Sequence, residues 1–349
     1  MAALLTRRTF TCVAGAGAAA LAVGRSRAAG WSGVGVYPIA IAMYQAQYVA
    51  AAKGFFKDAG IDCKLLQGGS GVKAREMVAS GEADIGIGDI THPMQLTNHG
   101  RPALVLMPAD TRNNAVVFVV RKDLADQGVT DLKSFAAWKR PDGRKPILGV
   151  SSLGGTTHVW ASYYLELMDL DQKVTWVGAG DVDTMLGTIK TKQIDALAAA
   201  PSLLRDAVAH GWGAPLFNGS SEANWNKYIG GKVPATAHFT LQSTIDRDKP
   251  KTQAYVDALW RATQWIKGQS PEEILTTIEP YVGSTSHDSN VFEVGLMKDV
   301  TDYEGIIDPA SYQRGAKVWF RDMTGIKPIP LDHMFVPDFV LAAKKAFPA

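Results

Sequence analysis

Cysteine is almost absent from this chain of 349 residues, since only Cys12 and Cys63 are present. Cys12 lies in a segment that we expect to be removed. The one remaining thiol cannot form an internal disulfide, so the fold must be held by an ordinary hydrophobic core. A chain of this length can bury such a core, and it suggests about two domains.

A strong net charge is also missing. The chain has 36 basic and 34 acidic residues, and four of the arginines lie in the first 28 residues, which contain no acid. The rest has 32 basic and 34 acidic residues. Nucleic-acid binding depends on neutralising phosphates, and attraction to anionic lipids depends on clustered lysine and arginine. The composition therefore argues against a nucleic-acid partner and against a polybasic membrane surface.

The local motifs of common enzymes are absent as well. The sequence has no phosphate-binding GxxxxGK[ST] loop, no GxSxG elbow, no HExxH and no CxxC. Its seven histidines show no metal-ligand spacing. We therefore expect no catalytic residues, no metal and no cofactor. An enzyme that assembles its site in space, using His92 or His158, stays open as the alternative.

The first 28 residues have the plan of an export signal. Arg7 and Arg8 precede an apolar run over residues 12–23, and small residues flank a cleavage point after Ala28. The paired arginines favour a twin-arginine signal over an ordinary Sec signal. Beyond residue 28 no uninterrupted apolar stretch is long enough to span a bilayer. The sequence therefore predicts an exported protein with a cleaved leader.

The rest of the chain alternates short apolar runs with helical patterns. Strands are predicted over residues 33–37, 63–66, 83–88, 103–107, 115–120, 146–150, 174–177 and 196–199. Helices are predicted over residues 45–58, 71–80, 91–98, 156–168, 182–190 and 201–209, and then, without further strands, over 253–267, 271–278, 290–298 and 311–323. Strand–helix alternation predicts an α/β fold with mostly parallel sheets flanked by helices.

An internal repeat favours two lobes of similar build. The segment Gly69-Ser70-Gly71-Val72 leads through a helical stretch to Asp84 and a strand, and Gly180-Asp181-Val182-Asp183 leads in the same way to Asp195. Chance similarity between α/β units is the alternative, because few residues are identical. The helices after residue 243 are expected to cap an existing lobe.

Ligands of open α/β sheets bind beyond the carboxyl ends of the strands. The candidate ligand residues in the loops that open helices there are Gly69, Ser70, Gly71, Asp89, Thr91, Ser151, Gly155, Thr156, Thr157, Gly180 and Asp181. Glycine allows close approach, and a helix N-terminus favours an anion. The alternative role is helix capping, which we favour for Asp89 and Asp181 because a carboxylate repels an anion.

Aromatic and basic side chains add further candidates. Tyr44 and Gln45 precede the first helix and could frame an organic ligand, or simply pack in the core. Arg112 could clamp a carboxylate or sulfonate through paired hydrogen bonds, or form a salt bridge. Trp160 and Trp176 could wall a pocket, although core packing is the more common role of buried tryptophan.

Several of these segments resemble one protein family. Lys53-Gly54-Phe55-Phe56 with Gly60, then Gly68-Gly69-Ser70-Gly71, Gly81-Glu82-Ala83-Asp84-Ile85-Gly86 and Val119-Val120-Arg121-Lys122-Asp123 resemble the substrate-binding proteins of nitrate/sulfonate/taurine-type ABC importers. The resemblance covers about residues 33–245, and its motifs are more specific for the family than for the ligand.

The resemblance implies a two-lobed, type II-like periplasmic binding protein with two crossing strands as its hinge, near residues 118–121 and 237–241. We expect the first lobe over residues 29–118, the second over 119–240, and a return to the first lobe with a helical cap over 241–349. It also implies a periplasmic monomer that delivers a small-molecule ligand to an ABC permease and ATPase. A pyrimidine synthase of the same superfamily, whose Cys-rich motif is missing here, and a sensor domain are the alternatives.

Overall fold

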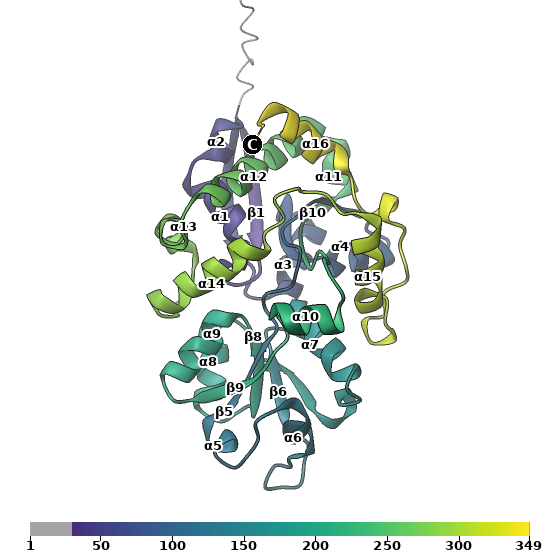
Figure 1. Cartoon of the computed structure of the whole chain (residues 1–349). Helices are drawn as coiled ribbons and strands as arrows, with labels where there is room; N and C mark the ends of the chain where they lie inside the picture. The colour runs from purple at the N-terminus through teal and green to yellow at the C-terminus, as the bar shows by residue number, and fades with distance from the viewer. Residues whose placement is uncertain (1–29, 349) are drawn as a thin grey trace, which may run out of the picture.

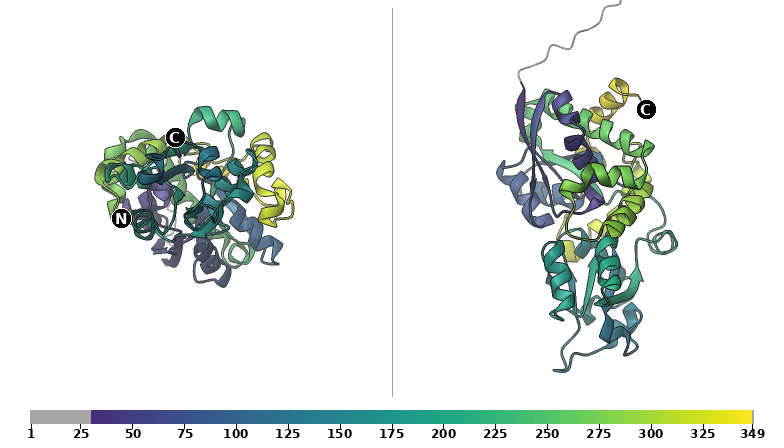
Figure 2. Two further views of the ribbon diagram at one scale, coloured as in Figure 1. Left: turned by 90° about the horizontal axis from the view of Figure 1, so that it is seen from below. Right: turned by 90° about the vertical axis from the view of Figure 1, so that its left-hand side faces the viewer.

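Two lobes, each built around one five-stranded sheet, make up the computed structural model, which describes residues 30–348 (Figure 1). The right-hand view of Figure 2 shows the lobes end to end, with the C-terminal helices returning to the lobe that contains the first strand. Among residues 30–348, no helix combines the length and the apolar character that crossing a membrane requires.

The first lobe holds the sheet of strand order β2-β1-β3-β10-β4. Its strands are β1 (Trp31–Tyr37), β2 (Ile61–Gln67), β3 (Ile85–Asp89), β4 (Ala103–Pro108) and β10 (Thr236–Leu241). β1 is parallel to β2 and β3, whereas β10 is antiparallel to both of its neighbours. Four strands therefore point one way and β10 alone points the other.

The second lobe repeats this arrangement with the order β7-β6-β8-β5-β9. Its strands are β5 (Val117–Arg121), β6 (Ile147–Val150), β7 (Thr175–Gly178), β8 (Ala196–Ala199) and β9 (Gly213–Asn218). β6 is parallel to β7 and β8, and β5 is antiparallel to β8 and β9. The expected mostly parallel α/β architecture of both lobes is confirmed.

The single reversed strand in each sheet follows from the way the chain crosses between the lobes. Residues 109–116 lead from β4 into β5, and residues 219–235, which include α10 (Glu222–Tyr228), lead from β9 back into β10. Each crossing starts at the carboxyl end of a strand in one sheet and reaches the other sheet at the end where its parallel strands finish. The entering strand must therefore run against its neighbours.

The crossing segments lie directly before the strands that were expected to cross. β10 also belongs by its pairing to the first sheet, although residues up to 240 were assigned to the second lobe. Its pairing with β3 and β4 is a long-range contact that the local pattern does not specify. The exact lobe boundaries stay a prediction.

Helices cover both faces of the sheets (Figure 1). Those of the first lobe before the crossing are α1 (Gln45–Ala52), α2 (Phe55–Asp58), α3 (Gly71–Ser80) and α4 (Thr91–Asn98). Those of the second lobe are α5 (Lys122–Ala125), α6 (Leu132–Ala137), α7 (Thr156–Glu166), α8 (Val182–Lys190) and α9 (Pro201–Ala209). After β10 come α11 (Gln242–Arg247), α12 (Lys249–Gly268), α13 (Pro271–Ile278), α14 (His287–Val300), α15 (Pro309–Trp319) and α16 (Pro337–Ala346).

Most of the predicted elements are present, but one predicted helix is broken and several elements were missed. The helix expected over 45–58 breaks into α1 and α2, because Gly54 takes a left-handed conformation with φ of 73°. The strand β9 was missed, since its edge position and Pro215 give a weak pattern. The helices α5, α6, α10, α11 and α16 were also missed, and all of them except α16 are short, with four to seven residues.

The internal repeat has a structural counterpart in two matching carboxylates. Asp84 Oδ2 accepts a hydrogen bond of 2.9 Å from the backbone N–H of Val34 in β1, and Asp195 Oδ2 accepts one of 2.8 Å from Ile147 in β6. Asp84 thus joins the residue before β3 to β1, and Asp195 joins the residue before β8 to β6. The two carboxylates occupy equivalent places in the two lobes. The repeat predicted from the sequence is therefore also present in the hydrogen bonding.

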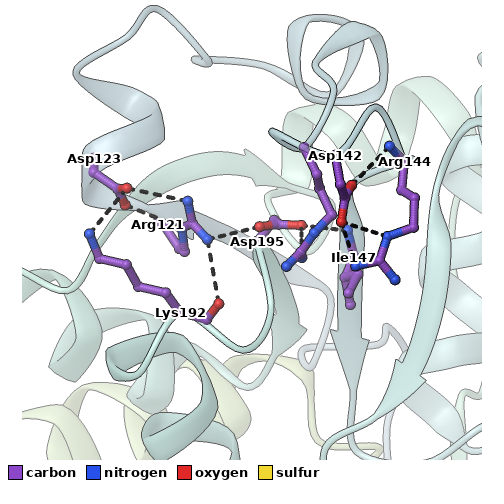
Figure 3. Close-up of polar contacts among 8 residues, drawn as sticks. Arg121, Asp123, Asp142, Arg144, Ile147, Lys192 and Asp195 are labelled. Carbon is purple, nitrogen blue, oxygen red and sulfur yellow. Dashed lines mark hydrogen bonds and ion pairs between the residues drawn. The ribbon is translucent and has the colours of Figure 1, made fainter.

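Basic side chains surround both carboxylates. Asp195 accepts a hydrogen bond from Arg121 Nη1 at 2.9 Å (Figure 3). It accepts another from Arg140 Nη1 at 2.7 Å. Asp84 pairs with Arg247 and Lys251, each at 3.0 Å.

The C-terminal helices touch both lobes. α12 packs against α1 and α16 of the first lobe, whereas α14 also packs against α9 and α15 against α7 of the second lobe. Two of the four predicted cap helices thus bridge the lobes, as the position of α14 and α15 between them shows (Figure 1).

Candidate functional site

A small cavity lies between the lobes, where the carboxyl ends of their strands face each other. Its volume is about 20 Å³, which leaves room for about one water molecule. Its wall is formed by Pro38, Ile39, Ile41, Met43, Tyr44, Gly71, Ala115, Ser151, Thr156, Thr157, Met185, Ala199 and Ala200. Residues from both lobes and from a crossing segment line it, so this structure has the lobes closed on the site.

The starts of α3 and α7 meet across this cavity. Ser70 caps α3 by accepting a hydrogen bond of 3.3 Å from the backbone N–H of Lys73. A Cβ added to Gly71 would lie 3.9 Å from the Cα of Gly155, which precedes α7. The two helix N-termini therefore lie close together, and the tighter neighbour of an added Cβ would be the His92 ring, at 3.1 Å.

Hydroxyl groups fix the loop that leads into α7. Thr157 Oγ1 accepts a hydrogen bond of 3.1 Å from the backbone N–H of Ser151 and lies 3.0 Å from the Ser151 hydroxyl. Thr156 and Thr157 are buried at the first turn of α7. The second lobe therefore presents hydroxyl and helix N-terminal groups to the cavity.

Asp89 ends β3 and is fully buried. Its Oδ1 accepts hydrogen bonds from the Thr91 backbone N–H at 2.9 Å and from the Thr91 hydroxyl at 2.6 Å. These bonds hold the start of α4 locally, but the N-cap of α4 is Ile90, so Asp89 stands one residue before the capping position expected for it. The side chains of Thr156 and Trp160, from the other lobe, lie beside the carboxylate and stabilise its charged form. Burial raises the pKa of Asp89 to about 6, and Thr91, Trp160 and Thr156 oppose that rise.

Tyr44, in the cavity wall, and its neighbour Gln45 are both buried. Gln45 Nε2 donates a hydrogen bond of 3.2 Å to Thr301 Oγ1, so the amide is tied to the end of α14. Burial is the main cause that raises the pKa of Tyr44, and the charges of Glu293, Asp89 and Asp110 raise it further. Tyr44 thus lines the cavity and has buried carboxylates around it.

The two histidines of the enzyme alternative are neutral here. Burial lowers the pKa of His92 to about 3, helped by the charge of Arg75, and lowers that of His158 to about 4, helped by Arg321. The His92 ring packs against Gly71 and Gly88. His158 Nδ1 accepts a hydrogen bond of 2.9 Å from the Gly154 backbone N–H, and its ring contacts Trp176.

Of the residues predicted from the sequence, five line the cavity: Tyr44, Gly71, Ser151, Thr156 and Thr157. Three more are chain neighbours of wall residues: Gln45, Ser70 and Gly155. Asp89 lies beside Thr156 of the wall, and Thr91 is hydrogen-bonded to Asp89. The other four are not in the wall. Their contact with a ligand stays a prediction.

Those four residues lie in other surroundings. Asp181 caps α8 through the Thr184 backbone N–H at 3.0 Å and, next to Gly180, borders a separate hollow. Gly69 has a φ of 79°, a turn conformation that suits glycine. Arg112 belongs to the first crossing segment, and its Nε has no hydrogen-bond partner.

The apolar part of the wall was largely missed. Pro38, Ile39, Ile41 and Met43 follow β1, whereas Ala199 ends β8 and Ala200 follows it. The rule that ligands bind beyond strand ends would have found both segments. Met185 and Ala115 carry no such signal in the sequence. Trp160 is fully buried and packs on Trp225 at 5.0 Å, which fits the core-packing alternative.

A larger hollow of about 660 Å³ lies next to the crossing segments. It is bordered by Asp110, Thr111, Lys232, Pro234, Lys267, Asp299, Thr301, Asp302, Tyr303, Glu304, Ile306, Asp308 and Ser311. No helix start of α3 or α7 reaches it. Within residues 30–348 no group of three or more His, Cys, Asp or Glu residues is placed to hold a metal ion.

Two similar lobes that meet at the carboxyl ends of their strands, with a closed site of apolar residues and hydroxyl groups between them, define the class of two-lobed solute-binding proteins. The chain belongs to the NMT1-like family, whose model matches residues 34–279. The resemblance drawn from the glycine-rich and aromatic motifs is thereby confirmed.

Known relatives agree with this class. A curated protein of Bacillus subtilis, the binding protein YtlA, is 23% identical over 279 residues, which are 76% of this chain and 75% of YtlA. A solved structure from Bordetella bronchiseptica RB50 has a TM-score of 0.76 at 20% identity and covers 91% of this chain and 98% of its own.

Two further solved structures carry ligand names. The nitrate-binding protein NrtA of Synechocystis PCC 6803 has a TM-score of 0.65 at 15% identity over 91% of this chain and 89% of its own. The alkanesulfonate-binding protein SsuA of Xanthomonas axonopodis pv. citri, bound to MOPS, has a TM-score of 0.64 at 12% identity over 90% of this chain and 97% of its own. At these identities the likeness shows that the fold is shared.

Proposed function

We propose that this protein is the extracytoplasmic solute-binding component of an ABC importer. It captures a small anionic or polar organic solute between its lobes and delivers it to a membrane permease and its ATPase. Sulfonates, taurine-like compounds, carboxylates and nitrate are the classes to consider. The observation that carries the proposal is the meeting of the α3 and α7 starts across a closed cleft.

The physics of capture follows from that geometry. In an open state the helix starts and hydroxyl groups of each lobe face water. Only in the closed state can a solute form hydrogen bonds with both lobes at once. Binding of the solute therefore shifts the population toward the closed state. A dissociation constant of about 1 μM corresponds to roughly −8 kcal/mol, within reach of a few charge-assisted hydrogen bonds.

The proposal includes export and cleavage of the leader. The predicted twin-arginine signal and its cleavage after residue 28 fall outside the described residues. Relatives named as nitrate- and alkanesulfonate-binding proteins support a periplasmic location, a transporter partner and a small-molecule ligand for this chain. We further propose that the protein acts as a monomer, since one chain supplies both walls of the cleft.

A thermal-shift screen followed by calorimetry tests the function. We expect at least one compound among sulfonates, carboxylates, nitrate, amines and amides to raise the melting temperature saturably, because a ligand at about 100 times its dissociation constant adds about 2.7 kcal/mol of stability. Thr156→Ala should lose most of that rise, since Thr156 lines the cleft. Thr276→Ala, on the exposed surface of α13, should keep it. A screen without any saturable shift would overturn the proposal.

A further inference from the structure

The wall of the cleft combines two kinds of surface that come from different elements. Gly71 belongs to the start of α3, and the hydroxyl groups of Ser151, Thr156 and Thr157 belong to the loop and first turn of α7. The apolar side chains come from the segment after β1, the first crossing segment, α8 and the end of β8: Pro38, Ile39, Ile41, Met43, Ala115, Met185, Ala199 and Ala200. The cleft therefore offers a solute a few polar groups and a more extensive apolar surface.

The backbone groups of the polar part are hydrogen-bond donors. Within residues 30–348, the backbone N–H groups of Gly71, Thr156 and Thr157 make no hydrogen bond. N–H groups in the first turn of a helix have no acceptor inside that helix, and Gly155 gives α7 no side-chain cap. An acceptor group on the solute would satisfy these donors.

The hydroxyl group of Tyr44 is a further polar group of the wall without a partner. Tyr44 is only 3% exposed and lines the cavity, yet its hydroxyl makes no hydrogen bond with any of the described residues. Buried polar groups are almost always hydrogen-bonded, so this hydroxyl indicates a partner that the solute supplies. Burial raises the pKa of Tyr44. The hydroxyl therefore keeps its proton and can donate a hydrogen bond.

Two buried methionines, one from each lobe, belong to the apolar part of the wall: Met43 and Met185. The methionine side chain is unbranched, has three rotatable bonds and adapts to irregular space. The closed cavity has room for about one water molecule, so rotation of these side chains would admit a larger solute. An inorganic anion, in contrast, would lose hydration against the apolar surface without gaining a partner there.

We propose that the cleft selects an organic solute with a compact hydrogen-bond-accepting head, namely a carboxylate, a sulfonate or an amide carbonyl, and an apolar body. The helix starts of α3 and α7 and the Tyr44 hydroxyl hold the head, and the apolar residues of both lobes hold the body. This inference rests on the proposed function and narrows its solute class, because it excludes nitrate and other inorganic anions. It also makes Tyr44 and Met185 specificity-determining residues.

A series with one head and bodies of different length tests the role of the apolar surface. Acetate, butanoate and hexanoate share the carboxylate, methanesulfonate, butanesulfonate and hexanesulfonate share the sulfonate, and nitrate has no body. Affinities are measured by calorimetry on the mature protein at neutral pH and constant ionic strength. Each methylene that reaches the apolar surface should tighten binding about fourfold, which corresponds to about 0.8 kcal/mol. We expect the longest acid of a series to bind at least tenfold more tightly than its shortest member and than nitrate.

A second series keeps the body and changes the head. Hexanoate, hexanesulfonate and hexanamide carry acceptors, whereas the head of hexylammonium carries only donors. At least one acceptor head should bind tenfold more tightly than hexylammonium, and the series separates a charged acceptor from a neutral one. Tightest binding of hexylammonium, of nitrate or of the shortest acids would overturn the inference.

Tyr44→Phe tests the contact with the head, because it removes only the hydroxyl group. It should weaken binding of the tightest acceptor at least tenfold. Tyr228→Phe, in α10 and outside the cavity wall, is the control and should leave that affinity unchanged. Unchanged binding in Tyr44→Phe would overturn the inference.

Met185→Gln tests the contact with the body at nearly constant side-chain length. The gain in affinity from the shortest to the longest acid should fall at least fivefold in this variant. Leu186→Gln, at the next position of α8 and facing a different hollow, should keep the full gain. Because the gain compares two solutes on one variant, a loss of stability alone does not change it. An undiminished gain in Met185→Gln would contradict the proposal.

Where no member of either series binds, the compound found in the broader screen decides. A compound that lacks the acceptor head or the apolar body overturns this inference and leaves the proposed function intact. A compound with both parts supports the inference when Tyr44→Phe and Met185→Gln weaken its binding, and overturns it when either variant binds it unchanged. The absence of any hit in that screen defeats the proposed function, and this inference with it.

Discussion

At the scale of single residues, Asp195 shows how a buried charge holds the second lobe together. Its side chain is fully buried between the guanidinium groups of Arg121 and Arg140, which are 12% and 19% exposed. It also accepts the Ile147 backbone N–H at the start of β6. The carboxylate therefore joins three separate segments of the lobe (Figure 3).

We expect Asp195→Asn to destabilise the protein by about 3 kcal/mol, because removing one partner of a buried ion pair leaves the other charge uncompensated. The free energy of unfolding in urea, compared with that of the unmodified protein, measures the effect. The neighbouring Asp123→Asn is the control. Asp123 is 37% exposed, so its loss should cost no more than about 1 kcal/mol. Equal effects of the two substitutions would contradict this account.

At the scale of elements, the break between α1 and α2 depends on one backbone conformation. Gly54 has a φ of 73°, and a Cβ added there would meet no atom within 4 Å. Space is therefore not the reason for a glycine at this position. The reason is the left-handed backbone conformation, in which a Cβ is unfavourable.

Gly54→Ala should lower the free energy of unfolding by about 1 kcal/mol through backbone strain alone. Gly187→Ala provides the matched comparison, since Gly187 lies inside α8 and also has no atom within 4 Å of an added Cβ. Alanine should stabilise that helix by roughly 0.5–1 kcal/mol. Thermal or urea unfolding of both variants measures the change in the free energy of unfolding. A change of the same sign in both variants would refute the argument.

At the scale of the whole molecule, polar contacts away from the cleft hold the lobes closed. Arg321, which follows α15, pairs with Glu166 and donates hydrogen bonds to the Val159 carbonyl at 2.7 Å and to Ser162 Oγ at 3.0 Å, all in α7. On the other side, Glu293 of α14 accepts hydrogen bonds from Ser202 of α9. Closure therefore depends on the C-terminal helices as well as on a solute.

Arg321→Ala should shift the solute-free protein toward an open state and weaken solute binding about tenfold, or about 1.4 kcal/mol, because the closed state loses contacts that it alone makes. Small-angle scattering should show a larger radius of gyration for this variant. Arg261→Ala removes a contact with Asp58 inside the first lobe, at 2.9 Å, and should change neither quantity. An unchanged radius in Arg321→Ala would rule out this role.

The sequence by itself determined those features of this protein that depend on residues close together in the chain. Helix starts and ends, as for α3, α4, α8 and α9, follow from capping residues and periodicity over a few positions. The repeat of Asp84 and Asp195 and the family motifs likewise lie in short segments.

Only the tertiary structure decided which of these segments face each other. The pairing of β10 with the first sheet, the contact of α14 with α9, and the convergence of Asp89, Asp110 and Glu293 around Tyr44 join residues far apart in the chain. Such contacts depend on the burial of whole lobe surfaces, to which every element contributes, and no local pattern specifies that sum. The positions of single groups in the cleft therefore emerged only once both lobes were folded.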